Sequence, residues 1–101
     1  PNMLAAGYTD GMRISSNSWG AAVGGAYNAT AQTYDTLVRD AQSGTAGNQS
    51  VVVVVSAGNS GPGATTIGSP ATAKNVITVG ATENVHPFAT PNGGSNANGA
   101  D

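Results

Sequence analysis

The chain has 101 residues, which is enough for one small domain. Only 8% of the residues are charged and the net charge is −2, so neither charge-driven disorder nor binding to a nucleic-acid backbone is expected. The absence of cysteine excludes a disulfide framework and a thiolate zinc site.

The first part of the chain predicts a short helix followed by a strand. Residues 3–8 resemble the last turn of a helix that Gly7 closes, and the start of the chain has no basic flank or long apolar core, so we expect no signal peptide in it. Residues 12–17 favour a strand that runs into Ser18-Trp19-Gly20. The Gly/Ala-rich residues 21–26 are typical of a loop.

A helical period follows. Apolar residues recur at helical spacing at Ala31, Tyr34, Leu37, Val38 and Ala41. Thr30 is a suitable N-cap, and Gly44 and Gly47 are expected to end the helix. Asp35 and Arg39 are four residues apart, so we expect a weak ion pair between them.

The second half predicts two more strands. Val51–Val55 is apolar without polar alternation, which is typical of a strand buried on both faces. This longest apolar run is far below the roughly 20 residues of a membrane helix, so no membrane partner is expected. A turn-rich loop over residues 58–70 leads to a strand within residues 75–81, in which Val76, Ile77 and Val79 should be buried. Residues 87–101 lack periodicity and are expected to be loop or disordered.

Strand, helix and strand in this order predict an α/β fold with a right-handed βαβ unit on a parallel sheet. Ligands on such sheets bind outside the carboxyl ends of the strands. Two of these ends carry unusual residues, Asn17-Ser18-Trp19-Gly20 and Ala57-Gly58-Asn59-Ser60-Gly61. Their glycines would let backbone and ligand approach closely.

These segments occur in an order that resembles subtilisin-like serine proteases. The resemblance rests on Asn17-Ser18-Trp19-Gly20, the long helix, the valine run ending in Ser56-Ala57-Gly58-Asn59, Gly68-Ser69-Pro70-Ala71 and residues 75–83, and it covers roughly residues 1–90. It implies that residues 1–101 are the middle portion of a secreted, three-layer catalytic domain with helices flanking a parallel sheet. The partners it implies are a polypeptide substrate and the remainder of the parent catalytic domain.

The resemblance also implies roles for single residues. Asn59 matches the asparagine whose side-chain amide donates to the oxyanion of the tetrahedral intermediate, a position that needs a neutral, rigid donor. Ser18-Trp19-Gly20 matches the segment that pairs with the substrate backbone as an added strand. Together with Ala57-Gly58 it would form the walls of the pocket for the residue before the scissile bond, although Trp19 could equally be core. Ser60 and Gly68 would lie at its rim or base, and the uncharged Ser60 suggests tolerance for large apolar residues.

Two further kinds of site remain open at this stage. Carbonyl groups near Ala71, Ala73 and Val76 match a weak cation site of some family members, so calcium is possible although no cofactor is required; an ordinary turn around Pro70 explains the segment equally well. The sequons at Asn28 and Asn48 fit a glycosylated product, but such triplets also arise by chance in a chain rich in Asn and Thr.

Catalysis in this family needs an aspartate, a histidine and a nucleophilic serine. The family's Asp-Thr/Ser-Gly, His-Gly-Thr and Gly-Thr-Ser-Met segments are absent from the sequence, and the single histidine, His86, lies in a different context. Asp10, Asp35, Asp40 and Asp101 also lack the motif context. The chain by itself is therefore expected not to hydrolyse peptides.

Alternative functions follow from that absence. The chain could be a non-catalytic module that binds extended peptides through Ser18-Trp19-Gly20, or a structural fragment without a site, in which Asn59 only caps a turn. The spacing of Gly58, Gly61 and Gly63 faintly resembles a dinucleotide-binding loop. Pro62 interrupts that loop, and no acidic residue follows about 20 residues on, so nucleotide binding is disfavoured.

Overall fold

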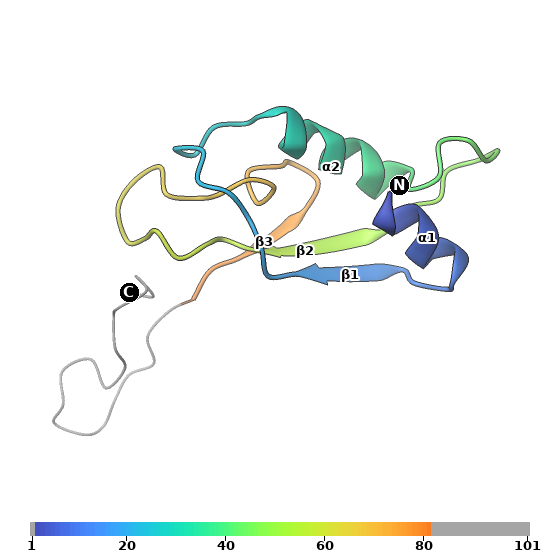
Figure 1. The fold of residues 1–101 in the computed structure, drawn as a ribbon, viewed down its shortest axis with the longest axis horizontal. Coiled ribbons are helices and arrows are strands. Elements are labelled where there is room, and N and C mark those ends of the chain that lie inside the picture. The colour runs from blue at the N-terminus through green and yellow to red at the C-terminus, as the bar shows by residue number, and fades with distance from the viewer. Residues whose placement is uncertain (1, 82–101) are drawn as a thin grey trace, which may run out of the picture.

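A computed structural model describes residues 2–81 of the chain, with two helices and three strands (Figure 1). In chain order these are α1 (Met3–Thr9), β1 (Ile14–Asn17), α2 (Ala29–Arg39), β2 (Val52–Ser56) and β3 (Ile77–Val79). Each predicted element is present, although β1 and β3 are shorter than the sequence predicts and β2 is shifted by one residue. The expected loop over residues 87–101 lies outside the described residues.

The three strands form one parallel sheet in the order β1-β2-β3. Ile14 is level with Val52 on one side of β2, and Val54 is level with Ile77 on the other. A parallel sheet with α2 in the crossover between β1 and β2 confirms the α/β prediction. Because β2 is central, the residues that follow it lie between the ends of its neighbours (Figure 1).

Only one face of the sheet is covered by the described residues. Val53 and Val55 of β2 are fully buried, and they pack in a core with Leu4 of α1 and with the apolar side of α2. Both helices thus cover the same face. The amphipathic stripe predicted for α2 is confirmed, since Ala31 is fully buried and Leu37 packs against this core.

The other face carries exposed apolar side chains. Val52 of β2 is 43% exposed, and Ile77 and Val79 of β3 are 55% and 52% exposed. The expectation that β2 is buried on both faces, and that Ile77 and Val79 are buried, is therefore wrong for the described residues. The physical reason is that the described residues 2–81 supply helices on one side of the sheet only. They therefore form two of the three layers that the resemblance implies.

Helix α1 ends differently from the prediction. It begins after Asn2, whose side chain accepts a hydrogen bond from the N–H of Leu4, and it continues through Gly7 to Thr9. The left-handed conformation belongs to Gly11, with φ of +96°. Gly7 lies inside the helix, where an added Cβ would be 2.9 Å from the sulfur of the flexible Met12 side chain.

Helix α2 begins two residues earlier than expected and ends before the glycines. Its N-cap is Asn28 rather than Thr30, and the last helical residue is Arg39. The predicted pairing of Asp35 with Arg39 is also wrong. Both carboxylate oxygens of Asp35 accept hydrogen bonds from other groups, namely the Tyr27 hydroxyl and two backbone N–H groups of the segment before β3.

Neither helix of the described residues 2–81 has the length and apolar composition of a membrane span.

Candidate functional site

A pocket of about 290 Å³ lies at the carboxyl ends of β1 and β2. Three chain segments form it: the residues after β1, the residues after β2, and the end of the loop that leads toward β3. Its lining residues are Ser18, Trp19, Gly20, Ala21, Ala22, Ser56, Ala57, Gly58, Asn59, Ser60, Thr66 and Gly68. The structure therefore brings together Asn59 and all seven residues predicted to bind substrate.

Backbone hydrogen bonds join the three segments in series. Ala21 and Ser69 form an isolated antiparallel bridge, in which each N–H donates to the other's carbonyl at 2.9 Å. The N–H of Gly68 donates to the carbonyl of Ala57 at 3.2 Å, and the N–H of Ala57 donates to Val79 of β3 at 2.9 Å. The pocket walls are thus continuous with the sheet.

Glycines permit the close approach of these walls. A Cβ on Gly68 would lie 2.9 Å from the carbonyl oxygen of Ala21, and one on Gly20 would lie 3.1 Å from the carbonyl oxygen of Ser69. Gly58 has a different requirement, because its φ of +102° is a conformation that L-residues rarely adopt. The glycines that the sequence singles out are needed for backbone geometry at the pocket.

Asn59 stands three residues beyond the end of β2, where the chain bends away from the sheet. Its side chain is exposed and lines the pocket. Within residues 2–81 the amide makes no hydrogen bond that would hold it to a turn. Its two N–H donors are therefore accessible to a group bound in the pocket.

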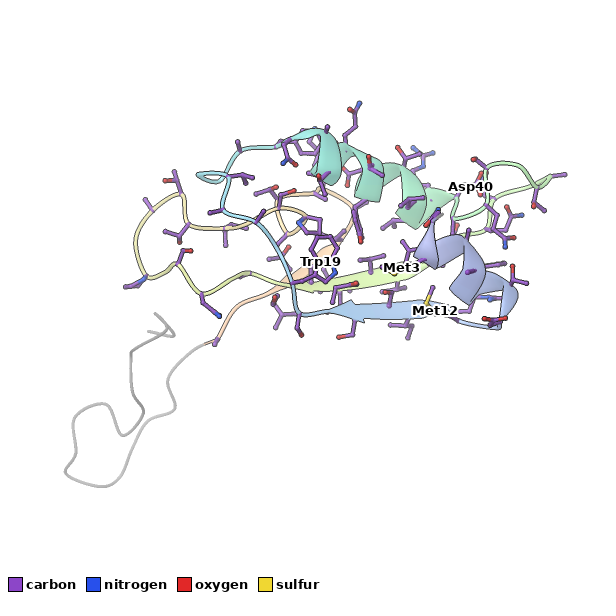
Figure 2. All side chains as sticks on the ribbon, in the orientation of Figure 1. Met3, Met12, Trp19 and Asp40 are labelled. Atoms are coloured by element: carbon purple, nitrogen blue, oxygen red, sulfur yellow. The ribbon has the colours of Figure 1, made fainter. Side chains whose placement is uncertain are left out.

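Trp19 combines the two roles that the sequence left open. Its ring meets Tyr34 of α2 edge to face, with centroids 5.9 Å apart, and its indole N–H donates to the side-chain oxygen of Asn17 at 3.3 Å. Figure 2 shows its side chain between the sheet and α2. The residue nevertheless stays 45% exposed and lines the pocket. Partial burial raises the pKa of Tyr34 above its ordinary value.

Two polar residues near the pocket make a contact that the sequence does not predict. Asn28 and Ser69 line no part of the pocket, yet their side chains are joined by a 2.7 Å hydrogen bond. Ser69 is 3% exposed. The signal that could have found Asn28 is its capping position before an amphipathic run, whereas nothing local connects it to Ser69, 41 residues away.

The carbonyls expected near a weak cation lie in the turn before β3. The carbonyl of Ala71 already accepts a 2.6 Å hydrogen bond from the hydroxyl of Thr78, and Ala71 is buried. Among the described residues, no group of three or more His, Asp or Glu side chains could hold a metal. A cation here would therefore depend on carbonyls such as those of Ala73 and Val76, and this site stays a prediction.

The two sequons differ in their surroundings. Asn48 is exposed in the loop after α2, whereas Asn28 is partly buried and its oxygen accepts two hydrogen bonds. Glycosylation at either position stays a prediction.

The carboxylates lie away from the pocket. Asp10 and Asp40 cap the ends of α1 and α2, and Asp35 is tied to the segment before β3. None of the three lines the pocket. His86 and Asp101 lie outside the described residues.

The pocket is also unlike a dinucleotide site. The residues from Gly58 to the start of β3 contain turns and bends and no helix. A phosphate-binding loop needs a following helix whose N-terminus faces the anion.

Comparison with known protein families shows that the sequence model of the subtilase family, peptidase S8, matches residues 2–100 of the chain.

Proposed function

Because the chain belongs to the subtilase family of serine peptidases, we propose that it supplies the oxyanion-binding asparagine and the substrate-binding walls of a subtilisin-like endopeptidase. The observation that carries this proposal is the single pocket that joins Asn59 to Ser18-Trp19-Gly20 and Ala57-Gly58. The reaction is hydrolysis of a peptide bond by acyl transfer to a serine.

Asn59 has the properties that an oxyanion donor needs. It is neutral, it follows a strand that is anchored in the core, and its amide is accessible from the pocket. In the tetrahedral intermediate the former carbonyl oxygen carries a negative charge, and an N–H aimed at that oxygen stabilises the transition state more than the ground state.

The residues after β1 suit pairing with an extended peptide. Trp19 and Gly20 make no backbone hydrogen bonds with the described residues, and both are exposed. Their N–H and C=O groups are therefore available to a substrate backbone, as in strand addition. The side chain before the scissile bond would enter the pocket between Gly20 and Gly58, where none of the described lining residues is charged. This favours apolar side chains.

The chain would act as one part of a larger catalytic domain. The nucleophilic serine, the histidine and the aspartate come, in this proposal, from the remainder of that domain. The exposed apolar face formed by Ile14, Val52, Ile77 and Val79 supports it, because an uncovered face of this kind is stable when another layer packs on it. We place the enzyme outside the cell, in line with its low charge and small-residue composition.

The first test uses a fluorophosphonate probe, which labels an activated serine, on the protein purified from its source. A labelled species much heavier than the 9.8 kDa of this chain supports the proposal. An unlabelled protein that still binds peptides would instead favour the alternative, a peptide-binding module without catalysis. A specific observation favours that alternative, since the described residues that line the pocket all lie between Ser18 and Gly68.

Two substitutions in the labelled enzyme then separate the roles. Asn59→Ala should lower kcat by about 10²–10³ with little change in KM. This range for kcat is the one known for subtilisin, the reference case for such donors. Trp19→Ala should mainly raise KM, because it removes part of the binding wall. Asn48→Ala, an exposed asparagine outside the pocket, is the matched control. Equal losses of kcat for Asn59→Ala and Asn48→Ala would contradict the proposal.

A further inference from the structure

One side-chain oxygen connects the start of α2 to the back of the pocket. The Oδ1 atom of Asn28 accepts the N–H of Ala31 at 3.0 Å, which caps the helix, and also the hydroxyl of Ser69 at 2.7 Å. An amide oxygen has two lone pairs, so these two donors saturate it. The Asn28 side chain therefore fixes the Ser69 hydroxyl relative to the start of α2.

Both hydrogen-bond donors of Ser69 are also paired. Its hydroxyl donates to Asn28, while its N–H and C=O both pair with Ala21. The residue is 3% exposed, so water does not readily replace any of these bonds. Ser69 thus links helix α2, through its side chain, to the pocket wall at Ala21, through its backbone.

The pocket depends on the position of this bridge. Gly20 and Gly68 flank the paired residues Ala21 and Ser69, and both glycines line the pocket. The carbonyl oxygens of the bridge already approach the glycines so closely that a Cβ would lie 2.9 to 3.1 Å away. A shift of Ser69 would therefore move both walls and change the width of the pocket.

We propose that Asn28 and Ser69 are a positioning pair that sets the width of the substrate pocket and thereby its selectivity between large and small side chains. The inference rests on the proposed function for the identity of the pocket as the site for the residue before the scissile bond. Neither residue touches the substrate, so the pair acts on selectivity through the bridge and leaves the chemical step to Asn59 and the triad.

The test compares two peptide substrates that differ only in that residue, phenylalanine or alanine, in the complete enzyme. Ser69→Ala keeps the backbone bridge and removes only the hydroxyl. We expect the selectivity ratio, kcat/KM for the better of the two substrates divided by kcat/KM for the other, to fall by about three- to tenfold, which is the effect of one hydrogen bond. The kcat for the better substrate should change less than twofold.

Variants at position 28 separate positioning from helix capping. Asn28→Asp retains an oxygen for both donors and should keep the wild-type ratio. Asn28→Ala removes both bonds. It should lower the selectivity ratio as Ser69→Ala does, and it should also lower the urea midpoint because the helix cap is lost. In the double variant with Ser69→Ala, the ratio should equal that of Asn28→Ala alone, since the two changes break the same bond.

An unchanged ratio in Ser69→Ala, with an active enzyme, would overturn the positioning role and leave the proposed function intact. A wild-type protein that cleaves neither peptide would overturn the proposed function instead. The ratio would then be measured from the Kd values of peptides ending in phenylalanine or alanine, and the same fall in Ser69→Ala is expected. Equal Kd ratios in the wild type and in Ser69→Ala would reject the pair.

Discussion

Asp35 and Asn75, which are 40 residues apart in the sequence, are joined by two hydrogen bonds. The N–H of Asn75 donates to the carboxylate of Asp35 at 2.7 Å, and its side-chain amide donates to the carbonyl of Asp35 at 3.2 Å. The carboxylate also accepts the N–H of Lys74 at 2.8 Å and the hydroxyl of Tyr27 at 2.7 Å. A single residue of α2 thus fixes the chain just before β3.

Substitution Asp35→Ala should lower the free energy of unfolding by about 1–2 kcal/mol. Hydrogen bonds to a charged group are strong, but solvent reaches this carboxylate and reduces their contribution. Urea denaturation measures the change, with an unchanged m-value expected. Asp10→Ala is the control, because the side chain of Asp10 is exposed and makes no hydrogen bond with the described residues. Equal midpoints for the two variants would rule out a role for the Asp35 contacts.

The same carboxylate predicts a dependence of stability on pH. Burial would raise the pKa of Asp35, but the hydrogen bonds from Tyr27, Asn75 and Lys74, with the charge of Lys74, outweigh burial and lower this pKa below its ordinary value. A lowered folded-state pKa stabilises the protein fully above the unfolded-state pKa of about 3.9, and this stabilisation is lost as the pH falls through the folded-state value.

Asp35→Asn should therefore be less stable than the wild type at pH 6, and the difference should shrink below about pH 4. This expectation is tested by measuring the urea midpoints of both proteins from about pH 6 to about pH 2.5, on both sides of the ordinary carboxyl pKa. A difference in midpoint that stays constant over that range would show that the ionisation of Asp35 does not contribute to stability.

Gly68→Ala should damage the pocket more than a comparable change elsewhere. Its Cβ would meet the carbonyl oxygen of Ala21 at 2.9 Å, and both partners belong to paired backbone that cannot move separately. We expect a loss of about 1–3 kcal/mol in stability and a higher KM for peptides. Gly44→Ala is the control, since no atom lies within 4 Å of its added Cβ. A Gly68→Ala enzyme with normal KM and stability would contradict the close contact.

The uncovered face of the sheet predicts self-association of the 101-residue chain when it is produced separately. Ile77 and Val79 are more than half exposed, and Ile77 is level with Val54 of the central strand. The chain should bind a hydrophobic dye and sediment as oligomers, and the double substitution Ile77→Thr/Val79→Thr, which keeps β-branched residues, should reduce both effects. A dye-negative monomer with a cooperative melt above about 60 °C would show that the face needs no cover.

The type and order of the helices and strands could be predicted from the sequence because they depend on local patterns. The valine run, the helical stripe and the short motifs at Trp19 and Asn59 carry their information within a few residues, and the family resemblance supplied the spatial grouping. By contrast, the bond between Asn28 and Ser69 and the contacts of Asp35 join segments about 40 residues apart. No local pattern encodes such partners.

Two errors have other physical causes. The cap of α2 differs from the prediction because Asn28 and Thr30 are both good capping residues, and only the backbone conformation decides between them. The exposure of Ile77 was missed because an apolar strand shows that a face needs cover but does not show which part of the chain provides it.

The pocket glycines Gly58 and Gly68 are required for unlike reasons. At position 68 the obstacle to a side chain is space. At position 58 space is ample, since the nearest atom to an added Cβ is 3.9 Å away, and the obstacle is the handedness of the backbone at φ of +102°. A library of pocket variants ranked by side-chain volume would therefore reject alanine at position 68 and wrongly accept it at position 58, where the chirality of natural amino acids sets the limit.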